Sequence, residues 1–552
     1  MLEKFRSAAP VAALAALALA ALTLTACGGG SSGGSDGAGG DPGGNSPTDA
    51  RLEVVLAGDA GAAGGRVVSQ PSGIDCGSAC SATFNLGTSV TLDATPASGR
   101  VFAGWSGDCS GSAATCSVSM DRARSVTARF DPAPPAAGWD DLAQLSAAGA
   151  DEPRIVIDAA GRATAIWRQL DTGASRRSVW TSHRPAGGRW SPPALLENSD
   201  HDVGDAALAV DPASGRTMAI WWELAGSSAE VHARAGDGDG RWSASARIGA
   251  QGRNAARLHV GLDAAGNAVA VWNQTDTTSR NSIWANRYSA SGGWGSALRV
   301  ADDGAQDLDP SLAVSADGSA VVVWSRLGSG IWASRAAAGG AWGTPVRLAA
   351  GLINVDVGAP RVAADANGNA VAVWAQSTTS GGRFATHLVS RRLSGGAWSA
   401  STVPLYAPVP GDVLSEARLA VDGRGRFAAA WGRVDGSVHA AWTDASAAWG
   451  TPATVRAAGS ELRSLPDIGL DSHGDAFATW SARNAATGTE EVWIARFTGN
   501  GGWTAPSLHQ PAGEIGGLPR VAVNARGDAA LVWIRNSGDG SRIAARSFTS
   551  GR

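Results

Sequence analysis

From residue 139 onward the chain repeats one pattern of apolar and polar positions eight times. In each copy a tryptophan follows a glycine by six residues, as with Gly161 and Trp167. Apolar residues alternate with other residues before this pair, which is the period of two of a β-strand. A short polar residue, usually Asp, stands between that run and the glycine, and it favours a tight turn in which glycine takes a positive φ. The pattern therefore predicts a β-hairpin at the start of each copy.

Two further apolar runs complete each copy. The third run often carries a tryptophan and an arginine, and a Gly-rich turn then leads to a fourth run that begins with tryptophan. Four short strands in about 52 residues are typical of one blade of a β-propeller. Because these tryptophans recur from copy to copy, we interpret them as packing between neighbouring blades.

The two ends of the repeat region complement each other. The eighth copy ends at Arg552 after its third strand, without a fourth-strand tryptophan. Trp139 lies in phase with the repeat, 51 residues before Trp190, but no strands of its own precede it. A ring in which the N-terminal strand completes the last blade explains both facts, whereas an open solenoid does not. We therefore predict an all-β protein whose residues 133–552 form an eight-bladed β-propeller closed by N-terminal strand exchange.

The first 26 residues have the pattern of a signal peptide. Positive residues precede an Ala/Leu run that is shorter than the roughly 20 residues that span a bilayer. The sequence Leu24-Thr25-Ala26-Cys27 resembles the lipobox of bacterial lipoproteins. This resemblance implies cleavage before Cys27, lipid such as palmitate on that residue, and a membrane-anchored cell-envelope protein. An ordinary secreted protein is the alternative.

Two features refine this expectation of a lipid-anchored protein. Gly28, and not Asp, follows the cysteine, which resembles an outer-membrane sorting signal in a double-membraned bacterium. Residues 27–50 are nearly all Gly, Ser, Asp, Pro and Asn, so they bury too little apolar surface to fold and are predicted to be a flexible tether.

The four remaining cysteines, Cys76, Cys80, Cys109 and Cys116, lie within 41 residues of one another. In an exported chain an even, clustered set indicates disulfides, of which three pairings are possible. We favour Cys76 with Cys80 and Cys109 with Cys116, because each pair closes a short Gly/Ser-rich loop. A zinc site is the alternative, but the paired CxxC spacing is missing.

Residues 51–132 contain short runs in which apolar and polar residues alternate, and these runs predict strands. The segment Gly104-Trp105-Ser106-Gly107-Asp108-Cys109 and the neighbouring strands resemble the divergent internalin B-type repeat of bacterial surface proteins. The resemblance implies a small disulfide-bonded β module that serves as a spacer or adhesive unit, and it brings no catalytic residues with it.

The charge of the chain is balanced, with 45 Lys plus Arg against 49 Asp plus Glu. This balance argues against a nucleic-acid partner, whose phosphates require clustered cations. We also find no HExxH, GxSxG or P-loop motif, so we predict no metal, no cofactor and no catalytic residue.

The propeller pattern resembles the Asp-box repeat of sialidases, which also combines Asp, Gly and Trp, but the spacing departs from it. A sialidase would need a Tyr nucleophile supported by a carboxylate, and Tyr288 and Tyr406 have no obvious acidic neighbours in the sequence. The departure puts sialidase activity in doubt.

One candidate binding surface follows from loop geometry. Two residues beyond the second-strand tryptophan, on the face opposite the Asp turns, most blades carry a long polar side chain. Loops on a rigid scaffold commonly carry binding residues. The candidates are Gln169, Glu223, Gln274, Arg326, Gln376, Arg433 and Arg535. The alternative is that these side chains only satisfy loop carbonyls.

Three hypotheses remain for the function. The favoured one is a lipid-anchored envelope protein whose propeller is a non-enzymatic binding scaffold for a glycan, peptide or protein partner. The second is an extracellular polysaccharide-processing enzyme, a sialidase-like glycoside hydrolase or lyase, which paired carboxylates in the central channel would favour. The third is a purely structural spacer.

Overall fold

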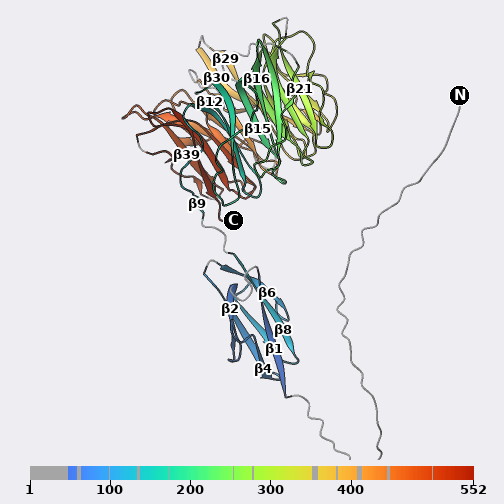
Figure 1. Ribbon diagram of the computed structural model, residues 1–552, viewed down its shortest axis with the longest axis vertical. Coiled ribbons are helices and arrows are strands. Elements are labelled where there is room, and N and C mark those ends of the chain that lie inside the picture. Colours follow the sequence, from blue (N-terminus) through green and yellow to red (C-terminus); the bar gives the residue numbers. More distant parts are fainter. Residues whose placement is uncertain are drawn as a thin grey trace, which may run out of the picture. The chain divides into compact units, whose positions relative to one another are not determined.

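The computed structural model describes residues 48–552, apart from 59–63, 99, 133–136, 172, 174, 251, 253, 277–278, 351–358, 381–382, 407–412, 444–447, 500 and 512. The chain divides into two compact units, Met1–Ala133 and Pro134–Arg552 (Figure 1). The predicted signal peptide, the lipobox and most of the tether lie outside the described residues. Within the described part, no helix is long and apolar enough to cross a membrane.

The first unit is a β module of two four-stranded sheets. Leu52, Val90, Val126 and Phe130 are fully buried between these sheets, as expected of strands with alternating apolar residues. The first sheet has the order β4 (Ser81–Asn85), β1 (Asp49–Ala57), β8 (Arg124–Pro132) and β6 (Arg100–Gly107), and the second has the order β3 (Asp75–Cys76), β2 (Gly65–Gln70), β5 (Ser89–Pro96) and β7 (Thr115–Ser119).

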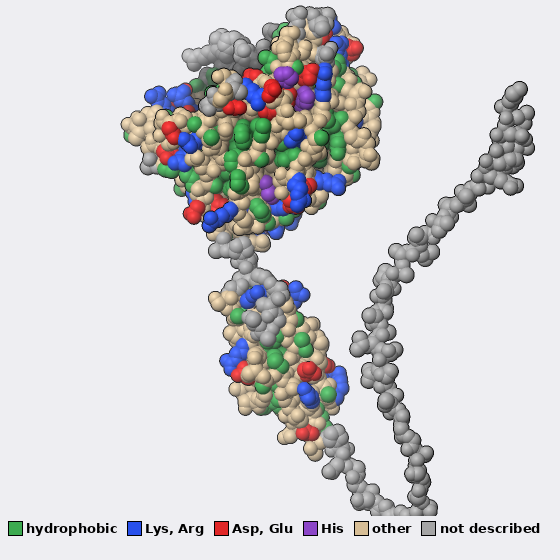
Figure 2. Space-filling view, viewed as in Figure 1, with side chains coloured by type: hydrophobic (Ala, Val, Ile, Leu, Met, Phe, Trp, Pro, Cys, Tyr) green, Lys and Arg blue, Asp and Glu red, His purple; other side chains and the backbone are tan. Residues whose placement is uncertain are grey.

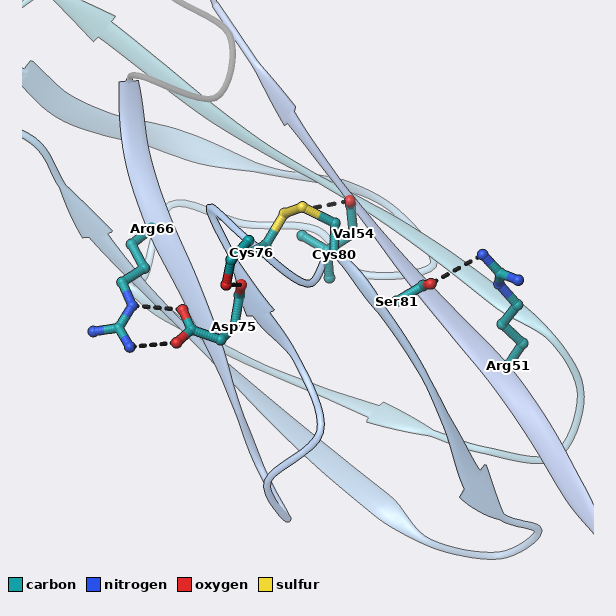
Figure 3. Close-up of a disulfide and its surroundings, with 8 residues drawn as sticks. Arg51, Val54, Arg66, Asp75, Cys76, Cys80 and Ser81 are labelled. Atoms are coloured by element: carbon teal, nitrogen blue, oxygen red, sulfur yellow. Dashed lines mark hydrogen bonds and ion pairs between the residues drawn. A yellow bond between two sulfur atoms is a disulfide. The ribbon is translucent and has the colours of Figure 1, made fainter.

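The predicted disulfide pairing in this module is confirmed. Cys76 is bonded to Cys80, and Cys109 is bonded to Cys116. Figure 3 shows the first bridge beside a bidentate ion pair, in which the guanidinium of Arg66 donates to both carboxylate oxygens of Asp75 at 2.6 Å. The bridges and this pair tie short loops to a core that is small, since fewer than 90 residues enclose it.

The second unit is the predicted eight-bladed propeller, and it contains eight separate sheets. Figure 1 shows these sheets side by side, coloured from teal to red along the chain. Blades 1 to 4 consist of β11 (Ala150–Ile157), β12 (Ala163–Asp171), β13 (Arg176–Arg184) and β14 (Ala194–Leu195); β15 (Asp202–Val210), β16 (Thr217–Ala225), β17 (Ser228–Gly236) and β18 (Ala246–Arg247); β19 (Asn254–Leu262), β20 (Ala268–Thr275), β21 (Asn281–Ser289), β22 (Gly293–Trp294) and β23 (Leu298–Arg299); and β24 (Asp307–Val314), β25 (Ala320–Arg326), β26 (Gly330–Ala336) and β27 (Val346–Ala350).

Blades 5 to 8 follow the same order of strands. They consist of β28 (Arg361–Ala364), β29 (Ala370–Ser380), β30 (Arg383–Ser394), β31 (Ala397–Trp398) and β32 (Val403–Tyr406); β33 (Arg418–Val421), β34 (Phe427–Gly432), β35 (Val438–Trp442) and β36 (Ala453–Arg456); β37 (Asp467–Leu470), β38 (Ala476–Arg483), β39 (Glu490–Thr498), β40 (Gly502–Trp503) and β41 (Ser507–Leu508); and β42 (Ile515–Val523), β43 (Ala529–Asn536) and β44 (Ser541–Thr549) with the N-terminal strands β9 (Gly138–Trp139) and β10 (Ala143–Gln144).

The first strand of each blade lies innermost, and these strands form a closed ring. Each contacts the first strand of the next blade, and β11 of blade 1 contacts β42 of blade 8. The second-strand tryptophans are at most 1% exposed, so they fill the space between blades as expected. In the turn of blade 3, Asp263 Oδ1 accepts the backbone N–H groups of Ala265 and Asn267, and Gly266 has a φ of 80°. Asp263 and Gly266 therefore account for the turn of this hairpin.

The predicted strand exchange closes the ring. Trp139 pairs with Phe548, and Gln144 pairs with Ala544. The Leu145 N–H donates to the Ile543 carbonyl at 2.8 Å. N-terminal residues therefore supply the outer edge of blade 8.

Candidate functional site

The predicted ligand-binding glutamines and glutamate lie inside the blades. Gln169, Glu223 and Gln274 are at most 9% exposed, and each accepts a hydrogen bond from the indole N–H of the tryptophan two residues earlier, at 3.3, 2.7 and 2.9 Å. The Gln274 amide also donates to the Ala250 carbonyl at 3.1 Å. These side chains therefore complete the hydrogen bonding of buried tryptophans. Gln376 is half-buried on β29 opposite His387.

The predicted ligand-binding arginines are held by carboxylates. Arg326 binds both oxygens of Asp307, at 2.7 and 2.9 Å, and one oxygen of Asp303 at 2.5 Å. In the same way, Arg433 pairs with Asp435 at 3.0 Å, and Arg535 pairs with Glu514. A ligand would have to displace these partners, so the arrangement favours the alternative that these residues satisfy their own blades. Their role in ligand binding stays a prediction.

The structure instead brings ionisable side chains together at the central channel, on the innermost strands. In every blade except blade 4, the residue four positions before the turn residue lines one cavity at this channel. In blade order this position holds Arg154, Ala207, His259, Ser311, Arg361, Arg418, Asp467 and Arg520. Four blades thus each contribute an arginine to the lining of this cavity.

A repeated β-bulge shapes the start of these strands. The pairing register shifts just before Arg154, His259, Ser311 and Arg520. The residue two positions before each of them has a positive φ of 47–54°, which is uncommon for residues other than glycine. Those residues are Glu152, Arg257, Asp309 and Leu518. Bulges bend a strand and redirect its side chains, and here they turn charged residues into the channel.

We call the resulting cavity the arginine basin. Its volume is about 630 Å³, and it is lined by Arg154, Arg257, Arg361, Arg418, Arg520, His259, Glu152, Asp205, Asp467 and apolar side chains that include Leu258 and Val260. This volume falls within the range of about 300–1,000 Å³ that small ligands occupy. The basin thus combines a concave shape with five guanidinium groups and three carboxylates.

Most of the carboxylates here are already engaged. Asp205 accepts from Arg154 at 3.2 Å and from the Leu258 N–H at 3.1 Å. Arg361 donates to Glu416 at 2.6 Å. Burial raises the pKa of Glu416, but Arg361, the Ala359 N–H and the charge of Arg418 together outweigh burial and hold this pKa below its usual range. Such bonds join one blade to the next, because Arg154 and Asp205 belong to blades 1 and 2, and Arg361 and Glu416 to blades 5 and 6.

Two of the arginines have no such partner. Among the described residues, neither Arg418 nor Arg520 forms an ion pair, and the Nε atom of Arg418 is buried without a hydrogen bond. Burial, together with the charges of Arg361 and Arg520, lowers the pKa of Arg418 to about 9. Burial also lowers the pKa of Arg520, although Asp467 opposes this shift. The basin therefore holds cationic charge that Asp467 and Glu416 compensate only in part.

His259 lies among these arginines as a neutral side chain. Burial first, and then the charges of Arg361, Arg418 and Arg154, lower its pKa to about 3. It therefore adds no charge at neutral pH, and it offers one ring nitrogen as an acceptor and the other as a donor. In contrast, the two tyrosines lie outside the basin, Tyr288 on β21 and Tyr406 on β32.

The arrangement suits the binding of an anion. Guanidinium groups match the planar geometry of a carboxylate and form two parallel hydrogen bonds with it. Among the described residues, no group of three or more His, Cys, Asp or Glu side chains could hold a metal ion. Sequence analysis missed this site because the arginines lie in four different repeats. The signal that could have found it is their common position four residues before the turn.

Several solved structures resemble the chain. The BP39L lectin from Burkholderia pseudomallei is 14% identical, with a TM-score of 0.43 over 66% of this chain and 100% of the lectin. An α-L-arabinofuranosidase from Fusarium graminearum is 8% identical, with a TM-score of 0.37 over 74% of this chain and 97% of that enzyme. An intramolecular trans-sialidase from Ruminococcus gnavus is 12% identical, with a TM-score of 0.32 over 72% and 94% of the two chains.

Comparison with curated proteins finds no match. A comparison with family models does find one, in the first unit. Residues 63–134 match the divergent InlB B-repeat domain, and this confirms the resemblance that the Gly-Trp-Ser-Gly segment of the module indicated.

Proposed function

We propose that the propeller is a non-enzymatic scaffold that binds an acidic glycan, with a carboxylate of the glycan held in the arginine basin. The observation that carries this proposal is the convergence of Arg154, Arg361, Arg418 and Arg520 from four blades into one cavity. An anionic group bound there would relieve the repulsion between Arg418 and its neighbours. This repulsion destabilises the protein without ligand, but the same arrangement keeps the site preorganised for an anion.

The distribution of charge favours a small acidic group over a long polyanion. The chain has a net charge of −4, and the face of the propeller in Figure 2 shows Arg side chains intermixed with Asp and Glu. A nucleic acid would need a continuous basic surface. A single concave site fits one charged sugar unit, whose ring could contact Leu258 and Val260 on the wall of the basin.

The location of the protein is part of the proposal. The lipobox-like sequence at Cys27 and the Gly/Ser-rich tether support a lipid anchor in the cell envelope, on the outer membrane of a double-membraned bacterium. The tether and the InlB-type module would then hold the propeller away from the membrane, where extracellular or envelope glycans are within reach. Metabolic labelling with a palmitate analogue tests this point, and loss of the label in Cys27→Ser is the expected result.

One observation favours the alternative of a polysaccharide-processing enzyme. Glu152, Asp205 and Asp467 line the same basin as the arginines, so carboxylates are available for acid and base chemistry. Asp205 is bonded to Arg154 and to a backbone N–H, and Asp467 accepts the Val521 N–H at 3.0 Å. Both carboxylates are thus already engaged in hydrogen bonds within the protein.

The decisive test measures binding of uronic-acid oligosaccharides by calorimetry. We expect the purified protein to bind them and to bind the same oligosaccharides at least tenfold more weakly after their carboxylates have been reduced to alcohols. The double variant Arg418→Met/Arg520→Met should also lose binding at least tenfold, since each good charge-assisted contact contributes about 1.5–3 kcal/mol. Arg189→Met, which changes an exposed arginine outside the basin, serves as the control.

Two results would contradict the proposal. Equal binding of the acidic and reduced oligosaccharides would show that the carboxylate is not recognised. Cleavage products in the same mixtures, lost on substitution of Glu152, Asp205 or Asp467, would support the enzymatic alternative instead.

A further inference from the structure

A second cavity lies between blades 3 and 4, and its lining includes the turns that carry the Asp residues. Its volume is about 540 Å³, and its polar and aromatic lining is formed by Asp263, Asn267, Arg287, Tyr288, Trp294 and Asp317. None of these residues lines the arginine basin. We propose that this cleft binds an arginine side chain presented by another polypeptide.

The protein itself shows how such a turn receives a guanidinium group. In blade 1, Arg162 Nε donates to Asp158 Oδ2 at 2.6 Å, and its Nη2 donates to the Ser214 carbonyl of blade 2 at 2.8 Å. The turn aspartate and the neighbouring blade thus hold one guanidinium between them.

Blade 6 repeats this arrangement. Arg426 donates to Asp422 Oδ2 at 2.6 Å and to the Ser472 carbonyl of blade 7 at 3.2 Å. The clefts after blades 1 and 6 are therefore both bridged by an arginine that stands four residues after the turn aspartate.

In blade 7 the guanidinium comes from a distant part of the chain. Arg552 lies 81 residues after Asp471 and approaches its Oδ2 atom at 3.3 Å, and it binds Asp475 at 2.8 Å. Arg496 binds the same Asp475 at 3.2 Å, so two guanidinium groups share this cleft. An arginine delivered from outside the hairpin can therefore fill this type of cleft.

Blade 3 has the acceptor of these arrangements without the guanidinium. Asn267 stands at the position of Arg162 and Arg426, and its amide donates to Asp263 Oδ2 at 2.8 Å. Among the described residues, Asp263 forms no ion pair. The shorter Asn leaves free the space that a guanidinium takes in blades 1 and 6, and this space is part of the cavity.

The remaining lining is suited to one additional cation. Asp263 and Asp317 against Arg287 leave one net negative charge in the cleft. Arg287 is turned toward the Ala337 carbonyl, at 3.4 Å, and toward the ring of Trp342. The rings of Tyr288 and Trp294 are 5.5 Å apart and half-buried, so they offer an aromatic surface for a guanidinium.

The boundary between blades 3 and 4 lacks an aromatic contact that is present between blades 7 and 8. Val269 lines the cleft, and the equivalent residue of blade 7 is Phe477, three residues after the turn glycine in both cases. Phe477 packs against Trp139 and Phe548, with ring centroids 5.7 and 5.1 Å away. Aromatic packing thus fills the boundary between blades 7 and 8, whereas the boundary between blades 3 and 4 stays open.

Calorimetric titration with the peptide acetyl-Gly-Arg-Gly-amide tests the proposal. The control peptide carries citrulline, which has the shape of arginine without its charge, and we expect it to bind at least tenfold more weakly. Asn267→Arg should fill the cleft with a guanidinium group of the protein itself and weaken the binding of the arginine peptide at least tenfold. Its thermal midpoint should not fall, because blades 1 and 6 already contain this pair. Asn369→Arg makes the same change beside Asp365 of blade 5, where neither residue lines this cavity, and it should leave binding unchanged.

Three outcomes would overturn the proposal. These are undetectable binding of the arginine peptide at millimolar concentration, equal binding of the citrulline peptide, and full binding by Asn267→Arg. Binding of simple glycosides that Asn267→Arg blocks, without binding of the arginine peptide, would identify a saccharide site instead. Should Asn267→Arg fold poorly, Asp263→Asn provides a second variant with the same expected loss. Arg418→Met leaves this cleft intact and separates its result from that of the basin.

Discussion

At the scale of single residues, the arginines of this propeller differ in whether a carboxylate compensates them. Arg326 and Asp307 are 7% and 2% exposed in their side chains and form a bidentate pair. Arg418 has no ion-pair partner among the described residues, and the repulsion from Arg361 and Arg520 outweighs the attraction of Asp467 and Glu416. A buried charge is tolerated when a bonded counter-charge compensates its desolvation, whereas an uncompensated one is costly unless a ligand supplies the counter-charge.

Opposite effects of two similar substitutions are expected from this difference. Arg326→Met leaves Asp307 buried without a partner, and we expect the free energy of unfolding to fall by about 3–5 kcal/mol. Arg418→Met removes a repelled charge and should raise the free energy of unfolding by about 1–3 kcal/mol without ligand. Denaturant titration measures both. If Arg418→Met were as destabilising as Arg326→Met, Arg418 would be a structural residue and the basin would lose its main cationic group.

The pH dependence of binding follows from the same residues. Because the pKa of Arg418 is lowered to about 9, the affinity for an acidic oligosaccharide should decline as the pH rises through 9. The folded protein loses this proton in a range where the unfolded chain keeps it, so the stability of the free protein should rise over the same range. His259, with a pKa of about 3, stays neutral between pH 5 and 8, so affinity should be constant there. Calorimetry at a series of pH values measures this profile, and an inflection near pH 6.5 would contradict it.

At the scale of elements, the strands that close the ring depend on a buried histidine. His509 follows β41 of blade 7, and its ring lies 4.6 Å from that of Trp139 in the closing strand β9. Burial, with a smaller contribution from Arg546, lowers the pKa of His509 to about 4. The folded state therefore keeps this histidine neutral in a range where the unfolded chain binds a proton.

Acid should consequently weaken the contact between blades 7 and 8. As the pH falls from about 6.5 to 4, protonation of the unfolded chain at this residue should lower the free energy of unfolding by about 3 kcal/mol. His509→Leu removes this contribution. The difference in the free energy of unfolding between the wild type and the variant should therefore change by that amount over the same pH range. Denaturant titration at pH 7 and pH 4.5 checks it, and an equal loss in both proteins would disprove the role of His509.

The sequence predicted the elements that depend on local chemistry. The Asp and Gly of each hairpin turn and the alternating apolar residues act within a few residues, so the blades and their number could be derived. The bulges before Arg154 and His259 could not, because no residue type marks them. The arginine basin could not be predicted for a related reason. Gln274 and Arg326 lie on the predicted face, but their side chains bond inside their own surroundings, whereas the ionisable cluster forms only when eight inner strands meet on one axis.

At the scale of the whole molecule, closure of the ring is what creates the basin. The first and last inner strands, β11 and β42, contact each other, and Arg154 and Arg520 belong to these two strands. The N-terminal strands hold blade 8 in place through Trp139 and through the Ser146 hydroxyl, which accepts the Ile543 N–H at 2.7 Å. The geometry of the basin therefore depends on the contact between blades 8 and 1.

Removal of residues 138–146 should open the junction. The outer edge of β44 would then lack its partners, and exposed edges promote association between chains. We expect a lower thermal midpoint, association in light scattering, and loss of oligosaccharide binding. A synthetic peptide of residues 137–147 added in trans should restore a part of each property. Unchanged stability and binding in the truncated protein would show that strand exchange is dispensable.

The most direct test of the central claim is a crystal structure of the protein with a uronic-acid oligosaccharide. A carboxylate of the sugar should lie about 3 Å from the guanidinium groups of Arg418 and Arg520, with the sugar ring against Leu258 or Val260. An oligosaccharide bound elsewhere on the propeller, with the arginine basin free of it, would contradict the account.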